Sequence, residues 1–177
     1  MLLYIEGLDK AGKSTFAKQL TAALQISIYR KLPPKNLDLT EHHSYFKGVG
    51  FALTELHNLF GFSAIVDRSF ISDWIYTNRD GEVRPIEVWS EWEKRHHDLL
   101  CAIIIYVDAP SEIIESRVSA APDPYMKVSD IARFRDLYEM YLRQTLFRVV
   151  RINGIADEAE RSRELEALKE LICPHLH

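Results

Sequence analysis

A glycine-rich run near the amino end has the residue types and spacing needed to hold phosphate. Residues 7–15 read GLDKAGKST and fit the P-loop pattern G-x-x-x-x-G-K-[ST]. An apolar strand pattern precedes the run and a helical pattern follows it, so backbone N–H groups at a helix start would converge on a polyphosphate. Lys13 would reach the outer phosphates, and the Ser14 hydroxyl would hold Mg²⁺. We expect the phosphate-binding set to be Gly7, Lys10, Ala11, Gly12, Lys13, Ser14 and Thr15.

A second group of polar residues follows a buried strand expected at 63–66. Asp67 lies at the carboxyl end of this strand, where its carboxylate would face the phosphates and Mg²⁺ through water. Arg68 carries a planar fork that suits an acceptor phosphate. Plainer roles are also open, namely a helix cap for Asp67 and an ion pair at the sheet edge for Arg68.

The elements that must position these residues alternate between strands and helices. A β-branched apolar run at 102–107 indicates a strand covered on both faces, and the apolar period of 130–147 indicates an amphipathic helix. The full pattern predicts one α/β domain, 1–177, with a parallel sheet and right-handed crossovers. We expect strands at about 2–6, 26–29, 63–66, 102–107 and 148–152, and helices at about 13–25, 41–60, 69–76, 87–100, 111–118, 130–147 and 157–172.

Composition narrows the class of protein and of partner. The 177 residues are 47% hydrophobic and 27% charged, which is typical of a soluble globular protein. A net charge of −4 argues against nucleic acid or a membrane as the main partner, and no apolar run is long enough to span a bilayer. Cys101 and Cys173 lack the spacing of a metal site, and the chain opens on a strand where a signal peptide would lie. These features predict a reducing, cytoplasmic location.

Three segments together resemble the thymidylate kinase-like family of P-loop nucleoside monophosphate kinases, which is related to the deoxynucleoside kinases. Residues 5–15 look like the P-loop of that family, and Asp67, Arg68, Ser72 and Tyr76 follow the spacing of its D-R segment. Residues 106–112 with Arg117 look like the strand, turn and helix that lead to its lid. The resemblance implies a three-layer α/β/α P-loop kinase fold with a parallel five-stranded sheet and a short lid at about 119–129. It also implies ATP with Mg²⁺ as the phosphoryl donor.

The same resemblance implies roles for single residues. Asp9 would contact the sugar 3′-hydroxyl of the acceptor, although a turn-forming aspartate is the alternative. Lys10 would supply the transition-state charge that the family draws from an arginine, because the lid stretch contains none; a solvated lysine is the alternative. Arg117 would reach the ATP phosphates, or lie on the helix surface. Asn153 and Gly154 stand where the family binds adenine, although an ordinary turn is equally compatible.

The absence of a glutamate after the second strand indicates which kind of phosphoryl acceptor the protein uses. Both related kinase types usually carry a glutamate before a proline after the second strand, whereas this chain has Arg30 and Lys31 before Pro33. A nucleoside acceptor benefits from a carboxylate base, but a monophosphate needs none and favours cations. We therefore expect a deoxynucleoside monophosphate, with dTMP as the first candidate. The alternatives are a deoxynucleoside kinase and a non-catalytic P-loop nucleotide-binding module.

The base pocket departs from the family pattern. The helix before the D-R segment holds Phe46 and Phe51, either of which would stack on a base, but it lacks the family's base-pairing arginine. Asp73 would accept hydrogen bonds from the base. The expected catalytic set is Lys13, Lys10, Arg68 and Asp67, and the expected substrate-binding set is Asp9, Arg68, Phe46, Phe51, Ser72, Asp73 and Tyr76. By the same resemblance we expect a homodimer.

Overall fold

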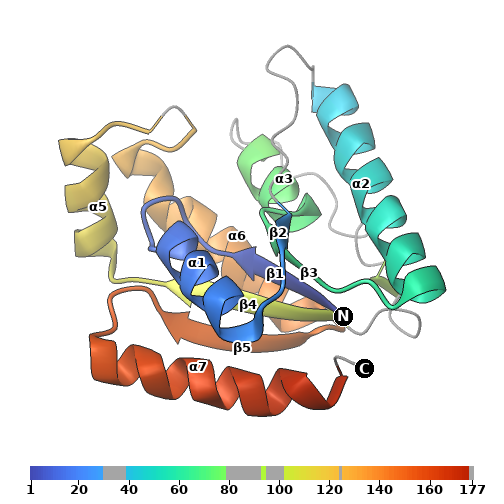
Figure 1. Ribbon diagram of the computed structural model, residues 1–177. Helices are drawn as coiled ribbons and strands as arrows, with labels where there is room; N and C mark the ends of the chain where they lie inside the picture. The colour runs from blue at the N-terminus through green and yellow to red at the C-terminus, as the bar shows by residue number, and fades with distance from the viewer. Residues whose placement is uncertain (30–38, 79–92, 95–101, 124, 176–177) are drawn as a thin grey trace.

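A parallel β-sheet forms the centre of the molecule (Figure 1). The computed structural model describes all residues except 30–38, 79–92, 95–101, 124 and 176–177. The strand order is β2-β3-β1-β4-β5, which places β1 and its P-loop in the middle. The strands are β1 (Leu2–Glu6), β2 (Ile28–Tyr29), β3 (Ala64–Asp67), β4 (Ala102–Asp108) and β5 (Arg148–Asn153). The predicted α/β class with a parallel sheet is confirmed.

Helices cover both faces of this sheet because its central strands alternate apolar side chains between two cores. The first core joins β1 and β4 to α1 and α7 through Leu3, Ile5, Phe16, Ile105 and Leu168. The second joins the opposite strand face to α3, α5 and α6. The helices are α1 (Lys13–Leu24), α2 (Leu39–Phe60), α3 (Phe70–Thr77), α5 (Ser111–Ala120), α6 (Ile131–Gln144) and α7 (Glu158–Ile172).

Some element bounds differ from those that the sequence predicts. Four strands have four residues or more. The fifth, β2, which the sequence predicts at about 26–29, is a two-residue edge pairing of Ile28 with Ile65 and Tyr29 with Val66. Helix α6 ends at Gln144 and not near 147, because Thr145 is extended and its N–H closes the last turn on Tyr141. The α2 helix continues through Gly48 and Gly50. Most of the helix predicted at 87–100 lies outside the described residues, as does Cys101.

The polar ends of the central strands meet at one edge of the sheet. β1 pairs with β3 up to Ile5 and Asp67, and with β4 up to Glu6 and Tyr106. In a parallel sheet these carboxyl ends share an edge, which is where α/β folds bind ligands. Across the part of the chain that the structure describes, no helix combines the length and the apolar character needed to cross a membrane.

Candidate phosphate-binding site

The loop between β1 and α1 needs glycine at two positions. Gly7 and Gly12 have φ angles of +133° and +104°, a region that favours residues without a Cβ atom. A Cβ on Gly7 would overlap the carbonyl oxygen of Val107, and one on Gly12 would lie 2.6 Å from the carbonyl oxygen of Gly154. The loop therefore packs closely on β4 and on the turn after β5.

A cleft of about 490 Å³ opens over this loop and over the end of β3. It brings together most of the predicted phosphate-binding and catalytic residues, including Ser14 and Asp67, the two predicted Mg²⁺ contacts. One hydroxyl and one carboxylate fit Mg²⁺, which keeps several waters and shares phosphate oxygens. The residues that line the cleft are Asp9, Lys10, Gly12, Lys13, Ser14, Thr15, Asp67, Arg68, Arg117, Ala120 and Ala121.

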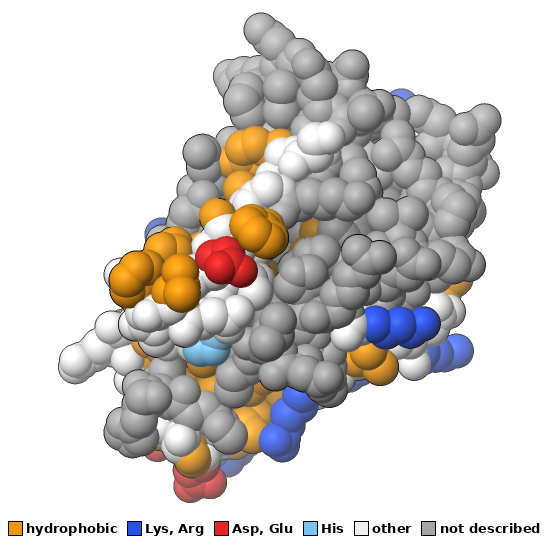
Figure 2. Space-filling view, turned by 90° about the vertical axis from the view of Figure 1, so that its right-hand side faces the viewer, with side chains coloured by type: hydrophobic (Ala, Val, Ile, Leu, Met, Phe, Trp, Pro, Cys, Tyr) orange, Lys and Arg blue, Asp and Glu red, His pale blue; other side chains and the backbone are white. Residues whose placement is uncertain are grey.

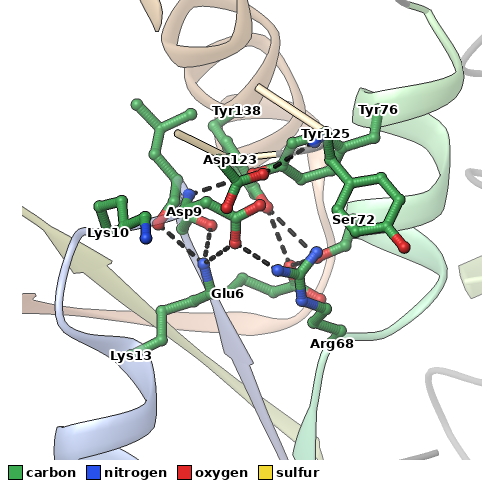
Figure 3. A network of polar contacts seen from close by, with 12 residues as sticks. Glu6, Asp9, Lys10, Lys13, Arg68, Ser72, Tyr76, Asp123, Tyr125 and Tyr138 are labelled. Atoms are coloured by element: carbon green, nitrogen blue, oxygen red, sulfur yellow. Dashed lines mark hydrogen bonds and ion pairs between the residues drawn. The ribbon is translucent and has the colours of Figure 1, made fainter. Parts of the chain in front are cut away.

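The buried ammonium group of Lys13 lies at the centre of the loop (Figure 3). Its Nζ donates to the carbonyl oxygens of Gly7 and Leu8 at 2.6 and 2.7 Å, and it pairs with Asp9 Oδ1 at 3.3 Å. Burial lowers the pKa of Lys13, and the nearby Asp9 carboxylate opposes that shift. The lysine is thus held by two loop carbonyl oxygens and one carboxylate oxygen.

Asp9 joins Lys13 to Arg68. Its Oδ1 accepts a short hydrogen bond from Arg68 Nη2 as well as the contact from Lys13. The Arg68 guanidinium lies 5.7 Å from the ring centre of Tyr76, and the Asp9 N–H donates to Tyr76 Oη at 3.1 Å. Burial raises the pKa of Asp9, but Lys13 and Arg68 outweigh this and leave it below its ordinary value. One carboxylate therefore neutralises two cations that face the cleft.

The D-R segment resolves two of the alternatives. Ser69, and not Asp67, is the N-cap of α3, since its side chain accepts from the Ile71 N–H at 3.2 Å. Arg68 does form an ion pair, but with Asp9 inside the cleft and not at an outer sheet edge. Its φ of +72° is a left-handed conformation that costs energy for a residue other than glycine. Such strain at a residue that lines a cleft is typical of functional sites.

Glu6 is a buried polar residue that the sequence reasoning missed. Its side chain lies at the end of β1, fully inaccessible to solvent, and accepts hydrogen bonds from Ser69, Ser72 and Tyr138. Burial raises the pKa of Glu6, and the hydrogen bonds from Ser69 and Ser72 oppose that rise. A charged residue ending an apolar strand directly before the P-loop is the one signal in the sequence. Its partners lie 63 to 132 residues away, so no local pattern reveals them.

Lys10 and Arg117 close the outer side of the loop. Lys10 has a φ of 65°, and its carbonyl oxygen accepts from Arg117 Nη1 at 2.7 Å. The arginines that flank the predicted lid turn elsewhere: Arg133 donates to the Asn78 carbonyl, and Arg135 pairs with Asp108 at 3.3 Å. Of the arginines in the described residues that are near the lid, Arg117 is the one that lines the cleft.

A second cleft of about 770 Å³ adjoins the first beside the turn after β5. Gly154 lines it, whereas Asn153 turns its side chain to Glu160 and to the Ile155 N–H. Arg161 also lines it, stacked 5.0 Å from the ring centre of Phe16, and was not anticipated. The structure thus brings one of the two predicted adenine contacts to a cleft that Gly12, Thr15 and Arg117 share with the phosphate site.

The predicted base and sugar contacts are scattered. Tyr76 lies beside Arg68, Ser72 is bonded to Glu6, and Asp73 is buried on α3. Phe51 is 58% exposed and lines neither of the two clefts, and the side chain of Phe46 lies outside the described residues. Among the residues that the structure describes, no group of three or more His, Cys, Asp or Glu is placed to hold a metal ion by itself.

Comparison with known proteins gives matches of structure alone. No family model matches the chain, and no curated protein matches it. The Bacillus subtilis protein YorR, solved in complex with phosphorylated GDP, superimposes with a TM-score of 0.71 at 18% identity, over 100% of this chain and 99% of that chain. The deoxyadenosine kinase of M. mycoides with dCMP and dCDP superimposes with a TM-score of 0.61 at 16% identity, over 98% and 99%. The same kinase with dATP gives a TM-score of 0.61 at 18% identity, over 98% and 100%. This chain therefore has the fold of YorR and of that deoxyadenosine kinase over nearly its whole length.

Proposed function

We propose that this protein transfers the γ-phosphoryl group of ATP to a deoxynucleoside monophosphate, with dTMP as the first candidate. The observation that carries the proposal is the pair of cations, Lys13 and Arg68, which converge on Asp9 in one cleft over the P-loop. Phosphoryl transfer between two anions demands positioned positive charge more than covalent help. The fold shared with a deoxyadenosine kinase supports this class of reaction.

On the donor side, the P-loop N–H groups and Lys13 would bind the phosphates of ATP. Lys13 now binds two loop carbonyls and Asp9, and it would exchange these partners for phosphate oxygens when ATP binds. Ser14 and Asp67 would hold Mg²⁺, the latter through water, and the ion would neutralise phosphate charge. Lys10 and Arg117 would add positive charge as the lid at 119–129 closes. Gly154 would border the adenine.

On the acceptor side, Arg68 would clamp the phosphate of the monophosphate with its planar fork. Asp9 has one buried oxygen, Oδ2, without a hydrogen-bond partner among the described residues. A buried carboxylate oxygen of this kind is stabilised by a donor, and the sugar 3′-hydroxyl of a deoxynucleotide would supply one. Ser72, Asp73 and Tyr76 would line the remainder of the acceptor site. Phe46 would be the stacking ring, because Phe51 lines neither cleft.

A deoxynucleoside kinase is the second candidate, favoured by the structural match to deoxyadenosine kinase. It requires a carboxylate near the 5′-hydroxyl. Asp9 and Asp67 both line the cleft with Arg68, and Asp67 would be the base, because Asp9 neutralises Lys13 and Arg68. A nucleotide-binding module without transfer is the third candidate, since Asp9 already neutralises both cations. We further propose a single cytoplasmic domain, 1–177, that acts as a homodimer and binds neither nucleic acid nor membrane.

ADP release tests these candidates directly. Purified protein with ATP and Mg²⁺ is offered each deoxynucleoside monophosphate and each deoxynucleoside in turn. The proposal expects ADP release to depend on one monophosphate, and Lys13→Ala to lose at least about a hundredfold in rate while its thermal unfolding stays cooperative. Turnover of nucleosides alone would favour the second candidate, and ATP binding without any turnover would favour the third.

A further inference from the structure

The backbone that carries Arg68 lies just past the end of the sheet pairing. The β1–β3 register ends at Ile5 and Asp67, and the next link is a long N–H contact of 3.5 Å from Arg68 to the Ile5 carbonyl. Arg68 itself is held at a left-handed φ, and α3 starts at once after Ser69. A strained residue keeps such a conformation only where its surroundings enforce it. Ladder hydrogen bonds do not supply that enforcement here.

The Glu6 carboxylate, at the end of the neighbouring strand, binds the residue that follows Arg68 (Figure 3). Its Oε1 accepts from the Ser69 N–H at 2.9 Å and from Ser69 Oγ at 2.6 Å. Its Oε2 accepts from Ser72 Oγ at 2.6 Å and from Tyr138 Oη at 3.1 Å. The carboxylate therefore joins β1 to the first turn of α3 and to α6, with all four contacts buried.

We propose that Glu6 is a positioning residue, which holds the Arg68 turn against the P-loop strand and so sets the distance between the acceptor clamp and the phosphoryl donor. This role rests on the proposed function. Glu6 lines neither cleft, so it acts through Arg68 and does not touch the substrate. Glu6 directly precedes Gly7, the first residue of the P-loop, and binds Ser69, which follows Arg68. It therefore connects the donor side of the site to the acceptor side.

The geometry of the four donors predicts which substitutions Glu6 tolerates. The Ser69 N–H can only donate, so the atom facing it must be an oxygen. Ser72 and Tyr138 carry hydroxyl groups, which can turn to accept from an amide NH₂. Glu6→Gln therefore keeps every contact by placing its oxygen toward Ser69, whereas Glu6→Leu removes every acceptor.

The test compares transfer kinetics with local protection of the α3 start. For Glu6→Leu we expect kcat/KM for the acceptor to fall at least about tenfold, while the Kd for ATP stays within about twofold. Glu6→Gln should stay within about threefold of wild type in both. In Glu6→Leu, hydrogen exchange at the Ser69 and Ile71 amides should lose protection relative to the β4 amides.

Two further variants keep the test decisive if Glu6→Leu does not fold. Tyr138→Phe removes one of the four donors. It should also lower kcat/KM for the acceptor without changing the Kd for ATP, but by less than Glu6→Leu does. Thr54→Val is the matched control, because Thr54 Oγ1 donates to the Gly50 carbonyl at 2.8 Å in a buried part of α2 away from both clefts. It should lower stability without separating acceptor from ATP.

Unchanged acceptor kinetics or unchanged Ser69 protection in Glu6→Leu would overturn the inference, as would a Thr54→Val variant with the same kinetic split. If the wild-type protein phosphorylates no acceptor, the proposed function fails and the positioning role falls with it. If the wild type transfers phosphate and the Glu6 variants are normal, the inference fails alone.

Discussion

The Asp9 side chain decides how the site behaves in the absence of ligand. Its carboxylate contacts both Lys13 and Arg68, so one group neutralises the two cations. Desolvated cations without a partner would be costly, and a buried ion pair offsets that cost. In the proposed function, an incoming anion would replace Asp9 as the partner of each cation, and Asp9 would then accept from a sugar hydroxyl.

The acid dependence of stability follows from this arrangement. The pKa of Asp9 is lower when the protein is folded than its unfolded value of about 3.9, so its stabilisation is complete above that pH and is lost as the pH falls through the folded value. Asp9→Asn removes this contribution. We expect the difference in free energy of unfolding between wild type and Asp9→Asn to be larger at about pH 7 than at about pH 3, measured with urea. An equal difference at both pH values would contradict the assigned ion pairs.

The shape of the Arg68 side chain gives a second prediction. Lysine keeps the charge but loses the planar fork that can grip two phosphate oxygens. For Arg68→Lys we expect the acceptor KM to rise by about tenfold, with the KM for ATP within about twofold. Steady-state kinetics with each substrate varied in turn measures both. A rise in the ATP constant alone would place Arg68 on the donor side.

Residue types alone reveal part of this site. Glycines and a lysine at P-loop spacing identify the phosphate end, because that chemistry is encoded in consecutive residues. The Asp9–Arg68 pair spans 59 residues, and the Glu6–Tyr138 contact spans 132. Such pairs arise from the order of the strands, which no short pattern states. The contacts of Glu6 therefore emerge only from the structure, whereas Arg117, which the family resemblance predicts at the phosphates, does line the cleft.

At the scale of elements, the turn after β5 packs directly against the P-loop and the end of β4. The Gly154 N–H donates to the Asp108 carbonyl at 2.5 Å, and a Cβ on Gly154 would overlap the Ala11 carbonyl oxygen. The same turn lies beside the second cleft. The three segments β4, β5 and the P-loop therefore fix one another at the edge of the sheet where ligands bind.

Two glycine substitutions test this packing against a matched control. Gly154→Ala should weaken ATP binding by at least about tenfold and lower the free energy of unfolding by about 1–3 kcal/mol, because the loop must shift. Gly48→Ala lies on α2, where a Cβ meets nothing within 4 Å. It should raise the free energy of unfolding by about 0.5–1 kcal/mol and leave ATP binding unchanged. ATP titration and urea unfolding of both variants give the comparison, and normal ATP binding by Gly154→Ala would contradict it.

The elements themselves follow well from sequence where their patterns are long and periodic. The buried run of β4 and the amphipathic pattern of α6 indicate a strand and a helix near the observed bounds. The edge strand β2 is shorter than its apolar run suggests, since it pairs on one side only. The start of α3 is decided by Ser69, whose hydroxyl both caps the helix and donates to Glu6, and not by the neighbouring Asp67.

At the scale of the whole molecule, one face carries apolar side chains that the core does not use. Figure 2 shows hydrophobic side chains gathered on the side where α2 lies. The exposed ones on α2 are Phe51, Leu56, Leu59 and Phe60. An apolar surface of this kind on a helix suits a protein interface, and it supports the proposed homodimer.

A single charge on that surface tests the dimer. We expect sedimentation velocity to report a dimer for the wild type at micromolar concentration and a monomer for Phe60→Asp, because a buried unpaired carboxylate is costly at an apolar interface. Val128→Asp is the control, since Val128 is also an exposed apolar residue but lies outside α2. A wild-type monomer, or a dimer that survives Phe60→Asp, would contradict an interface through this face.

The whole fold places the P-loop, two cations and a carboxylate at one cleft, and we propose that this arrangement transfers a phosphoryl group to a phosphate. The most direct measurement incubates the protein with γ-labelled ATP, Mg²⁺ and either a deoxynucleoside monophosphate, dTMP first, or in parallel reactions a deoxynucleoside, and separates the labelled products. We predict label in the deoxynucleoside diphosphate for the wild type, and label that forms at least about a hundredfold more slowly for Lys13→Ala. Label that appears only in a monophosphate made from an added nucleoside, or label that remains in ATP with every acceptor, would contradict it.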